Sequence, residues 1–127
     1  MSHALTNGIL VTVKSAYMPE RSAPTLRRFA FAYTVTIANQ GRETSQLMSR
    51  HWVITDSEGE VQEVRGDGVV GEQPVLAPGE AFEYTSWCVI ATPSGSMRGT
   101  YQMVGEAGMH FEAEIASFRL GMPHSLN

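Results

Sequence analysis

The stretch RGDGVVGEQPVLAPGE, residues 65–80, holds three glycines in the spacing G-x-G-x-x-G. This spacing binds the pyrophosphate of a dinucleotide when a strand precedes it and a helix N-terminus follows it. Here two prolines, Pro74 and Pro78, come within seven residues of the last glycine, and proline is excluded from a helix interior. No βαβ pattern surrounds the stretch, so its residues argue against a Rossmann nucleotide site.

Two interpretations of these glycines remain. In the first, they supply the positive φ angles that a strand end, a bulge and a tight turn require. In the second, their unhindered N–H groups form an anion-binding concavity without a helix. Arg65 would add positive charge to such a site, whereas Asp67 would oppose a phosphate unless a divalent cation lay between them. The candidate anion-binding residues are Arg65, Gly66, Gly68, Gly71 and Arg98.

Arg98 belongs to a second loop-like stretch, ATPSGSMRG, in which Thr92, Ser94 and Ser96 bring hydroxyl groups. These side chains offer hydrogen-bond donors to an anion, and an ordinary hairpin loop explains the same composition. Consecutive loops of an antiparallel meander lie at opposite ends of a sandwich. We therefore expect the two glycine-containing stretches to form separate sites, unless the long connection 65–79 crosses between sheets.

Residues that could carry catalysis or hold a metal are scattered along the chain. The single cysteine, Cys88, alternates with apolar residues and is expected to be a buried thiol. His51 and His110 stand alone, without the H-x-x-x-H or C-x-x-C spacing of a zinc site. Acidic residues alternate along the turn 56–60, and a solvated hairpin explains them as well as a hard cation does. We predict no catalytic residue, no metal site and no cofactor, and a protein that is not an enzyme.

The overall composition narrows the class of partner. Nine Lys and Arg residues against 13 Asp and Glu residues give a formal net charge of −4 and a pI near 5.5, unlike the basic surface of a nucleic-acid-binding domain. The first ten residues lack a signal-peptide pattern, and no apolar run approaches the length of a membrane span. We expect a cytoplasmic protein with no nucleic-acid and no membrane partner. Its 127 residues suit a single domain, 1–127.

Apolar residues alternate with polar or small residues along most of the chain, which is the pattern of half-buried strands. The segments expected as strands are 8–19, 27–39, 45–57, 60–66, 80–90, 97–105 and 109–120. Clusters of Gly, Pro, Asn and Asp separate them, and both termini, 1–6 and 121–127, are expected to fray. The pattern predicts an all-β fold, an antiparallel β-sandwich of about seven strands.

Three runs, GDGVVGEQPVLAPGEAFEYTSW, TPSGSMRGTYQM and SRHWVITDSEG, resemble the ApaG family over most of the chain, from residue 8 to residue 120. The family pattern reads G-x-G-V-V-G-x-Q-P-x-L-x-P-G-x-x-F-x-Y-x-S, then T-P-x-G-x-M-x-G-x-Y-x-M. Trp87 departs from it, because a glycine is usual there. The matching positions are Gly66, Gly68, Val69, Val70, Gly71, Gln73, Pro74, Leu76, Pro78, Gly79, Phe82, Tyr84, Ser86, Thr92, Pro93, Gly95, Met97, Gly99, Tyr101 and Met103.

The resemblance implies a fibronectin-III/immunoglobulin-like sandwich and a stand-alone bacterial protein. A similar domain is attached to eukaryotic F-box proteins and to a polymerase-interacting protein, which implies protein–protein interaction. The bacterial family is genetically associated with cobalt and magnesium handling, often lies near a diadenosine-polyphosphate hydrolase gene, and has a glycine motif suggested to bind pyrophosphate. None of these associations is a biochemical activity.

Two functional hypotheses follow. The first is a non-enzymatic module that binds an unidentified protein partner, as a monomer or homodimer, with Trp52 and Trp87 as candidate contacts because large exposed apolar groups often mark interfaces. The second is a protein that binds a small phosphate-containing ligand, pyrophosphate or a nucleotide polyphosphate, at residues 65–71. A hydrolase acting on such ligands would need a general base that the sequence does not offer.

Overall fold

Nine strands form two antiparallel sheets across residues 1–123, the part of the chain that this computed structural model describes. The first sheet runs in the order β1 (Ser2–Thr6), β2 (Ile9–Tyr17), β3 (Phe29–Asn39) and β7 (Ala81–Ile90). The second runs in the order β5 (Val61–Asp67), β4 (Ser45–Asp56), β8 (Ser94–Gly105) and β9 (His110–Gly121), and the two-residue β6 (Val75–Leu76) also pairs with β4. Two 3-10 turns, η1 (Pro19–Arg21) and η2 (Pro24–Leu26), connect β2 to β3.

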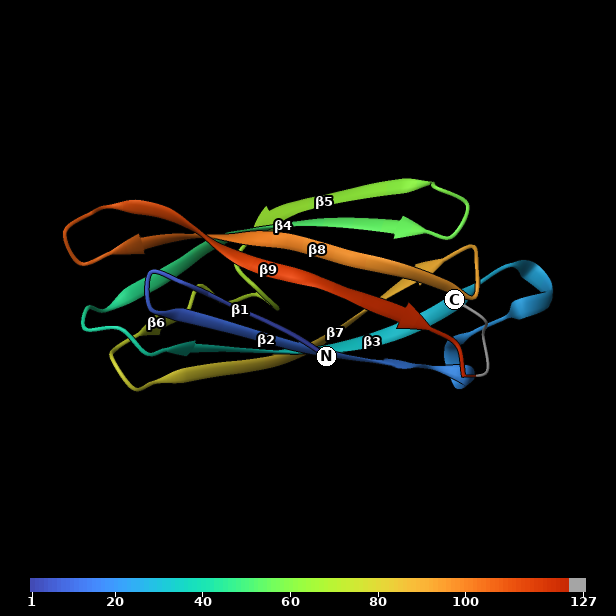
Figure 1. Cartoon of the computed structure of the whole chain (residues 1–127), viewed down its shortest axis with the longest axis horizontal. Coiled ribbons are helices and arrows are strands. Elements are labelled where there is room, and N and C mark those ends of the chain that lie inside the picture. Colours follow the sequence, from blue (N-terminus) through green and yellow to red (C-terminus); the bar gives the residue numbers. More distant parts are fainter. Residues whose placement is uncertain (124–127) are drawn as a thin grey trace.

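The two sheets stack as the layers of a sandwich, with the second sheet above the first in Figure 1. Strands β2, β3 and β7 form the main part of one layer and β4, β5, β8 and β9 form the other, which is the three-on-four arrangement of a fibronectin-III/immunoglobulin-like domain. The predicted fold class is therefore confirmed. No helix in residues 1–123 is long and apolar enough to cross a membrane.

The expected number of strands was too small, because β1 and β6 were not foreseen. The prediction that residues 1–6 fray is wrong: β1 pairs with β2 along its whole length, from Ser2 opposite Val13 to Thr6 opposite Ile9. Its connection is the two-residue turn Asn7–Gly8, in which both residues have positive φ. Asn-Gly is a strong hairpin signal, and it stood in the sequence. Of the expected C-terminal fraying, residues 124–127 lie outside the described residues.

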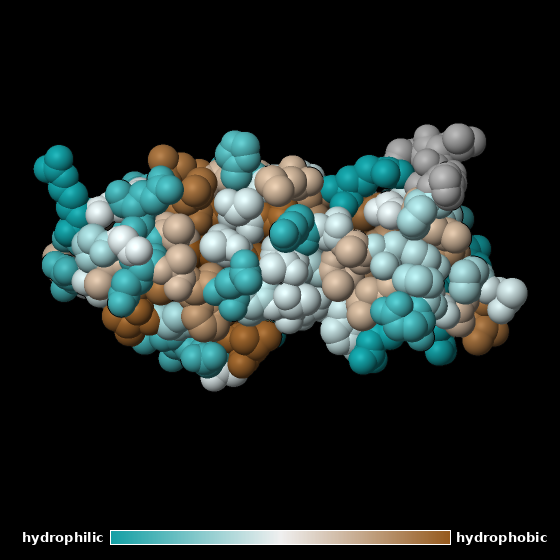
Figure 2. Space-filling model, turned by 90° about the horizontal axis from the view of Figure 1, so that it is seen from below, coloured by the Kyte–Doolittle hydropathy of each residue, from teal (hydrophilic) through white to brown (hydrophobic). Residues whose placement is uncertain are grey.

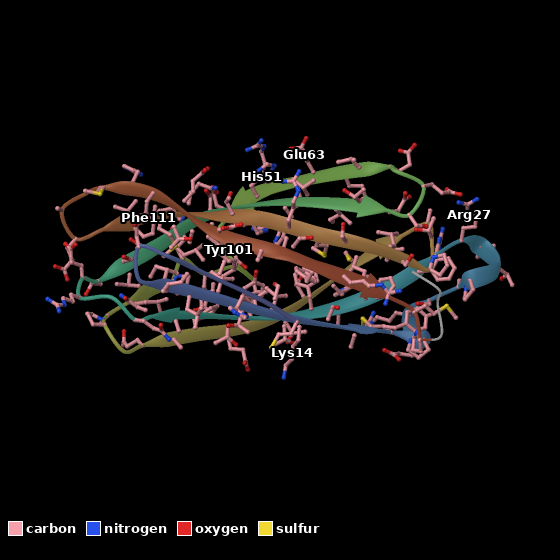
Figure 3. All side chains as sticks on the ribbon, in the orientation of Figure 1. Lys14, Arg27, His51, Glu63, Tyr101 and Phe111 are labelled. Carbon is pink, nitrogen blue, oxygen red and sulfur yellow. The ribbon has the colours of Figure 1, made fainter. Side chains whose placement is uncertain are left out.

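The inward-facing residues of both sheets form one apolar core. Trp52 is 2% exposed and packs against the rings of Tyr33, Tyr101 and Phe118, so the prediction that it is an exposed contact residue is wrong. Alternation along β4 placed it with the apolar set, and the opposing sheet buries that set. The hydroxyls of Tyr84 and Tyr101 hydrogen-bond to each other inside this core, and Figure 3 shows Tyr101 between the two layers.

The two long sides of the sandwich differ. On one side β1 and β2 contact β9: Glu114 donates its N–H to Thr6 Oγ1 (3.1 Å), and Ser15 Oγ donates to the carbonyl of Arg119 (2.8 Å). On the other side, β5 and β7 are the last strands of their sheets. Within the described residues, neither pairs with a further strand on its outer edge.

Candidate functional site

Arg50 on β4 organises the glycine-containing loop that follows β5. Its Nη1 atom donates hydrogen bonds to the carbonyl oxygens of Asp67 (3.0 Å) and Gly68 (2.9 Å). The guanidinium lies against Gly66, the residue opposite Arg50 in the ladder between β4 and β5. A Cβ atom at Gly66 would sit 2.9 Å from Arg50 Cζ, so the first glycine of the motif makes room for an arginine of the same chain.

The other two glycines serve a tight turn. Gly68 has φ of +62°, and a Cβ atom there would lie 2.2 Å from the carbonyl oxygen of Glu72. Val69 and Glu72 exchange both backbone hydrogen bonds (2.8 and 2.9 Å) across a two-residue connection. The residues of that connection, Val70 and Gly71, have φ of 43° and 81°, which is a type I′ turn.

These contacts show where the loop directs its backbone groups. Gly68 donates its N–H to the carbonyl of Met48 (2.8 Å), and Val69 donates its N–H to Glu72. The carbonyls of Asp67 and Gly68 face the guanidinium. Two of the amides that would hold an anion are thus hydrogen-bonded within the protein, and anion binding at 65–71 stays a prediction.

The two arginines of the predicted site lie on the outer face of the second sheet. Arg65 is opposite His51, and Arg98 is opposite Val53, on the strands either side of β4. Glu63 is opposite Val53, in the same row as Arg98, and its Oε1 is 2.8 Å from His51 Nε2 and 3.8 Å from Arg65 Nη2. The hydrogen bond from His51, with the positive charges of Arg65 and Arg98, holds the pKa of the Glu63 carboxyl below its usual value. Figure 3 shows His51 and Glu63 pointing away from the core.

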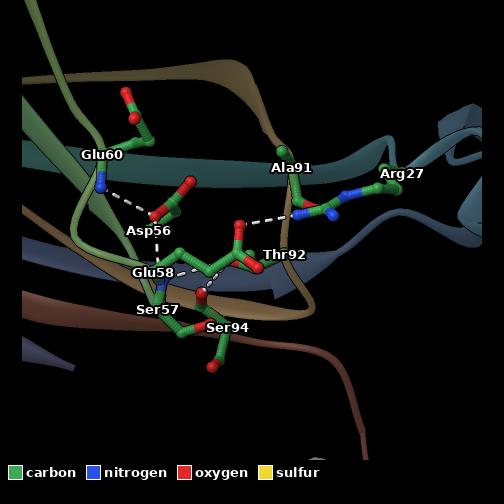
Figure 4. Close-up of polar contacts among 8 residues, drawn as sticks. All are labelled: Arg27, Asp56, Ser57, Glu58, Glu60, Ala91, Thr92 and Ser94. Atoms are coloured by element: carbon green, nitrogen blue, oxygen red, sulfur yellow. Dashed lines mark hydrogen bonds and ion pairs between the residues drawn. The ribbon is translucent and has the colours of Figure 1, made fainter.

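The second glycine-containing stretch lies at the far end of β4. Thr92 Oγ1 accepts the N–H of Ser57 (3.1 Å) and donates to the carbonyl of Ser94 (2.7 Å), tying the loop before β8 to the hairpin between β4 and β5 (Figure 4). Met48 and Ser57 are nine residues apart along an extended strand, which is about 30 Å. The loop around Thr92 is therefore far from the loop around Gly68, whereas Arg98 of the second stretch lies on β8, on the same face as Arg65.

The acidic turn at 56–60 is built around a buried carboxylate. Asp56 Oδ1 accepts the N–H groups of Glu58 (2.9 Å) and Glu60 (3.0 Å), and Arg27 Nη2 pairs with Glu58 Oε1 at 2.6 Å (Figure 4). These contacts close the hairpin and connect it to the turn before β3. Among residues 1–123 no group of three His, Cys, Asp or Glu side chains is arranged to hold a metal ion.

Cys88 lies on the inner side of β7 and is partly buried. Its Sγ atom donates to Met97 Sδ at 3.7 Å, and burial raises the pKa of the thiol to about 12. The thiol is therefore protonated at neutral pH and is a poor nucleophile. His110, at the start of β9, is exposed.

A groove of about 290 Å³ opens on the side of the sandwich between β5 and β7. Its floor consists of Tyr33, Trp52 and Ile54, and its walls come from the two edge strands. Arg50 lines it as well, which adds one positive charge to a groove whose other side chains are uncharged. Reasoning from the sequence did not select Arg50, because its place in the groove depends on the pairing of β4 with β5.

Comparison with known proteins identifies the family. The family model described as the ApaG domain matches residues 19–105. The chain is 60% identical to Protein ApaG of Anaeromyxobacter dehalogenans (strain 2CP-C) over the full length of both chains, and 60% identical to Protein ApaG of Pseudomonas aeruginosa (strain LESB58) over 92% of this chain and 93% of that one. The chain belongs to the ApaG family. The crystal structure of a Bordetella pertussis protein named ApaA is 57% identical, with a TM-score of 0.89 over 92% of this chain and 95% of that chain.

In this ApaG-family chain the glycines of the motif have structural roles. The glycines of the motif surround the guanidinium of Arg50 and the turn at Val70, as the distances above show. Trp87, where the family pattern has glycine, lies on the outer side of β7 and is 51% exposed, with the Arg21 guanidinium 5.3 Å from its ring centre. Gly66 and Trp87 thus lie on β5 and β7, the two strands that border the groove.

Proposed function

We propose that this ApaG-family chain is a non-enzymatic protein-interaction module that binds its partner along the free edge of β7. The supporting observation is the composition of that edge. Residues 84–90, YTSWCVI, carry no charge, and on their outer side Trp87 and Val89 are 51% and 37% exposed. Natural sheets protect a free edge with charged side chains, proline, bulges or a covering segment, and residues 84–90 have neither charge nor proline.

The free edge of β7 is a better candidate for the interface than the outer face of the first sheet. Figure 2 views the molecule from the side of the first sheet, and its apolar residues form separate patches between polar ones. Separate apolar residues are normal on a soluble surface, whereas interfaces use contiguous patches. A free strand edge binds through its backbone groups and needs fewer apolar contacts.

Photo-crosslinking tests this function. A photoreactive amino acid placed at position 87, in cells that produce the protein naturally, should give defined crosslinked products. The same amino acid at position 34, on the outer face of β3, is the control and should give fewer products of different size. Equal patterns at both positions, or no product at position 87, would contradict an interaction along β7.

Anion binding is a second candidate function, favoured by one observation. Arg65 and Arg98 lie on the same face, near enough to Glu63 to lower the pKa of its carboxyl. Pyrophosphate or a diadenosine polyphosphate would lie between these guanidinium groups, and a divalent cation would offset the charge of Glu63 and Asp67. Calorimetry with these ligands, with and without Mg²⁺ or Co²⁺, tests the idea. Heat that disappears in Arg65→Gln and Arg98→Gln supports it, and no heat at millimolar ligand ends it.

A further inference from the structure

The inner face of β5 has no sheet opposite it. Every residue of β5 except Gly66 is exposed, including Gln62 and Val64, which share the inner side with Trp52 and Ile54 of β4. Val64 is 38% exposed although it points toward the interior of the sandwich. The first sheet ends at β7, so it stops short of covering β5, and one more strand beside β7 would fill this space.

The free edge of β7 presents backbone donors toward that space. Asn39 donates its N–H to the carbonyl of Glu80 (2.9 Å), one pair beyond the ladder between β3 and β7. Hydrogen-bonded pairs alternate along an antiparallel ladder, so the even-numbered residues of β7 direct their N–H groups toward β3. The N–H groups of Thr85, Trp87 and Val89 therefore point away from β3, and an added strand would accept them.

A positive charge faces the same space without an acidic partner. Arg50 uses only Nη1 for its two hydrogen bonds to the loop carbonyls, which leaves Nε and Nη2 for another acceptor. None of the ion pairs within residues 1–123 includes Arg50. The Nε and Nη2 edge of a guanidinium binds a carboxylate with two parallel hydrogen bonds.

We propose that an extended segment of a partner protein adds to the free edge of β7 and places an Asp or Glu side chain on Arg50. This proposal rests on the interaction function proposed above and names the chemistry of the partner. Alternate side chains of the added strand would point inward. Their apolar groups would pack against Val64 and the floor of the groove, and the carboxylate would accept hydrogen bonds from Arg50. The outward side chains would lie beside Trp87 and Val89.

A second copy of the chain that pairs through its own β7 does not supply this charge. The residues of β7 that point inward are Phe82, Tyr84, Ser86, Cys88 and Ile90, and none is acidic. Pairing of two β7 edges would therefore leave the guanidinium without a carboxylate, which favours a partner of different sequence.

The test begins with a phage-displayed library of random octapeptides, selected on the full chain. Selected peptides should share one acidic residue with apolar residues two positions away on each side. Each is then synthesised with its acidic residue and with the matching amide, Glu to Gln or Asp to Asn, and the affinities are measured by fluorescence anisotropy. With the wild-type protein, the amide peptide should bind at least tenfold more weakly than the acidic peptide. With Arg50→Gln, the amide peptide should bind no more than twofold more weakly than the acidic peptide.

Lys14→Gln is the matched control, because it removes a positive charge from an exposed position on β2, in the first sheet, that Figure 3 shows pointing away from the sandwich. It should change peptide affinity less than twofold. In the complex, hydrogen–deuterium exchange of the Thr85 and Trp87 amides should slow at least tenfold. Since the acid-to-amide change is made in the peptide, it tests the carboxylate contact even if Arg50→Gln perturbs the loop.

Several results would overturn the proposal. The first two are selected peptides that share no acidic residue, and an acid-to-amide effect on affinity that persists in Arg50→Gln. The next two are protection from exchange of amides outside β7, and displacement of the peptide by millimolar acetate alone. The last is a dimer formed through β7 that the peptide does not dissociate. If crosslinking at position 87 captures a partner and Arg50→Gln leaves that product unchanged, the interaction function stands and the carboxylate contact falls. If crosslinking at position 87 also captures no partner, both the interaction function and the carboxylate contact are contradicted.

Discussion

The guanidinium of Arg50 occupies the space that the side chain of Gly66 would need. The two residues are opposite each other across β4 and β5, and the ideal Cβ position of Gly66 lies within 2.8 to 2.9 Å of three guanidinium atoms. From this position Arg50 binds the carbonyls of Asp67 and Gly68. The glycine spacing is that of a phosphate-binding loop, but in this protein the loop binds the guanidinium of Arg50.

Replacement of Gly66 by alanine should destabilise the protein by about 1–3 kcal/mol. The added methyl group displaces the guanidinium, and hydrogen bonds from a charged donor contribute on that scale. Urea unfolding of Gly66→Ala, Arg50→Gln and the double variant measures the coupling. The alanine should cost less in the Arg50→Gln background, since the displaced group is then absent. Equal costs in both backgrounds would show that Gly66 has a role apart from Arg50.

Gly68 and Gly71 should differ sharply in their tolerance of alanine. Both have positive φ, but a Cβ atom at Gly68 meets the backbone oxygen of Glu72 at 2.2 Å, whereas the space at Gly71 is open. Gly71→Ala should cost about 1–2 kcal/mol, the penalty for a left-handed alanine. Gly68→Ala should cost at least about 2 kcal/mol more, because backbone must move. Urea midpoints of the two variants compare them directly, and similar midpoints would contradict the close approach at Gly68.

The strands were predictable where one face of a segment is apolar and the other is not. In β3 the residues Phe29, Phe31 and Val35 alternate with small or polar residues, and burial of one face produces that pattern. β1 has little alternation and was missed, although its Asn7–Gly8 turn is a local hairpin signal that outweighs this weak pattern. Periodicity therefore finds half-buried strands better than the edge strands that leave most of their surface in water.

The site was less predictable than the fold, because it depends on contacts between strands. The sequence placed Arg65 and Gly66 side by side, yet their side-chain positions belong to opposite faces of β5. The role of Arg50 needs a residue 16 positions away in the chain. Alternation also placed Trp52 and Trp87 in strands without deciding which tryptophan the opposing sheet covers.

Acid should remove a stabilising contribution of Glu63. The pKa of its carboxyl is lowered in the folded protein, first by the hydrogen bond from His51. A carboxyl with a lowered folded pKa stabilises the protein above its unfolded pKa of 4.5, and this contribution disappears as the pH falls through the folded pKa. The urea midpoint of the wild type should therefore fall toward that of Glu63→Gln below pH 4.5. When His51→Leu is added to both proteins, the urea midpoints with and without Glu63→Gln should differ much less across the same pH range. An unchanged difference would assign the effect to another group.

The thiol of Cys88 should react slowly in the native protein. Burial raises its pKa from 9.0 to about 12, which lowers the thiolate fraction at pH 8 by roughly a factor of a thousand. Alkylation by iodoacetamide, followed by mass spectrometry, should be at least tenfold slower in buffer than in 8 M urea. The matched control is Val89→Cys in a Cys88→Ser background, because residue 89 points outward on the same strand. Rapid native alkylation of Cys88 itself would show that the groove opens more than this structure indicates.

The two tryptophans should respond in opposite ways to truncation and to quenching. Trp52 is 2% exposed and contacts three aromatic rings, so Trp52→Ala should cost about 3–5 kcal/mol of unfolding free energy. Trp87→Ala should cost about 1 kcal/mol or less, because half of its surface is in water and its contact with the Arg21 guanidinium is an exposed cation–π pair. In single-tryptophan proteins, acrylamide should quench the emission of Trp87 in the Trp52→Phe variant and leave Trp52 largely unquenched in Trp87→Phe. Binding of an acidic strand peptide beside β7 should then protect Trp87 from the quencher, which connects the stability of the fold to the proposed use of its free edge.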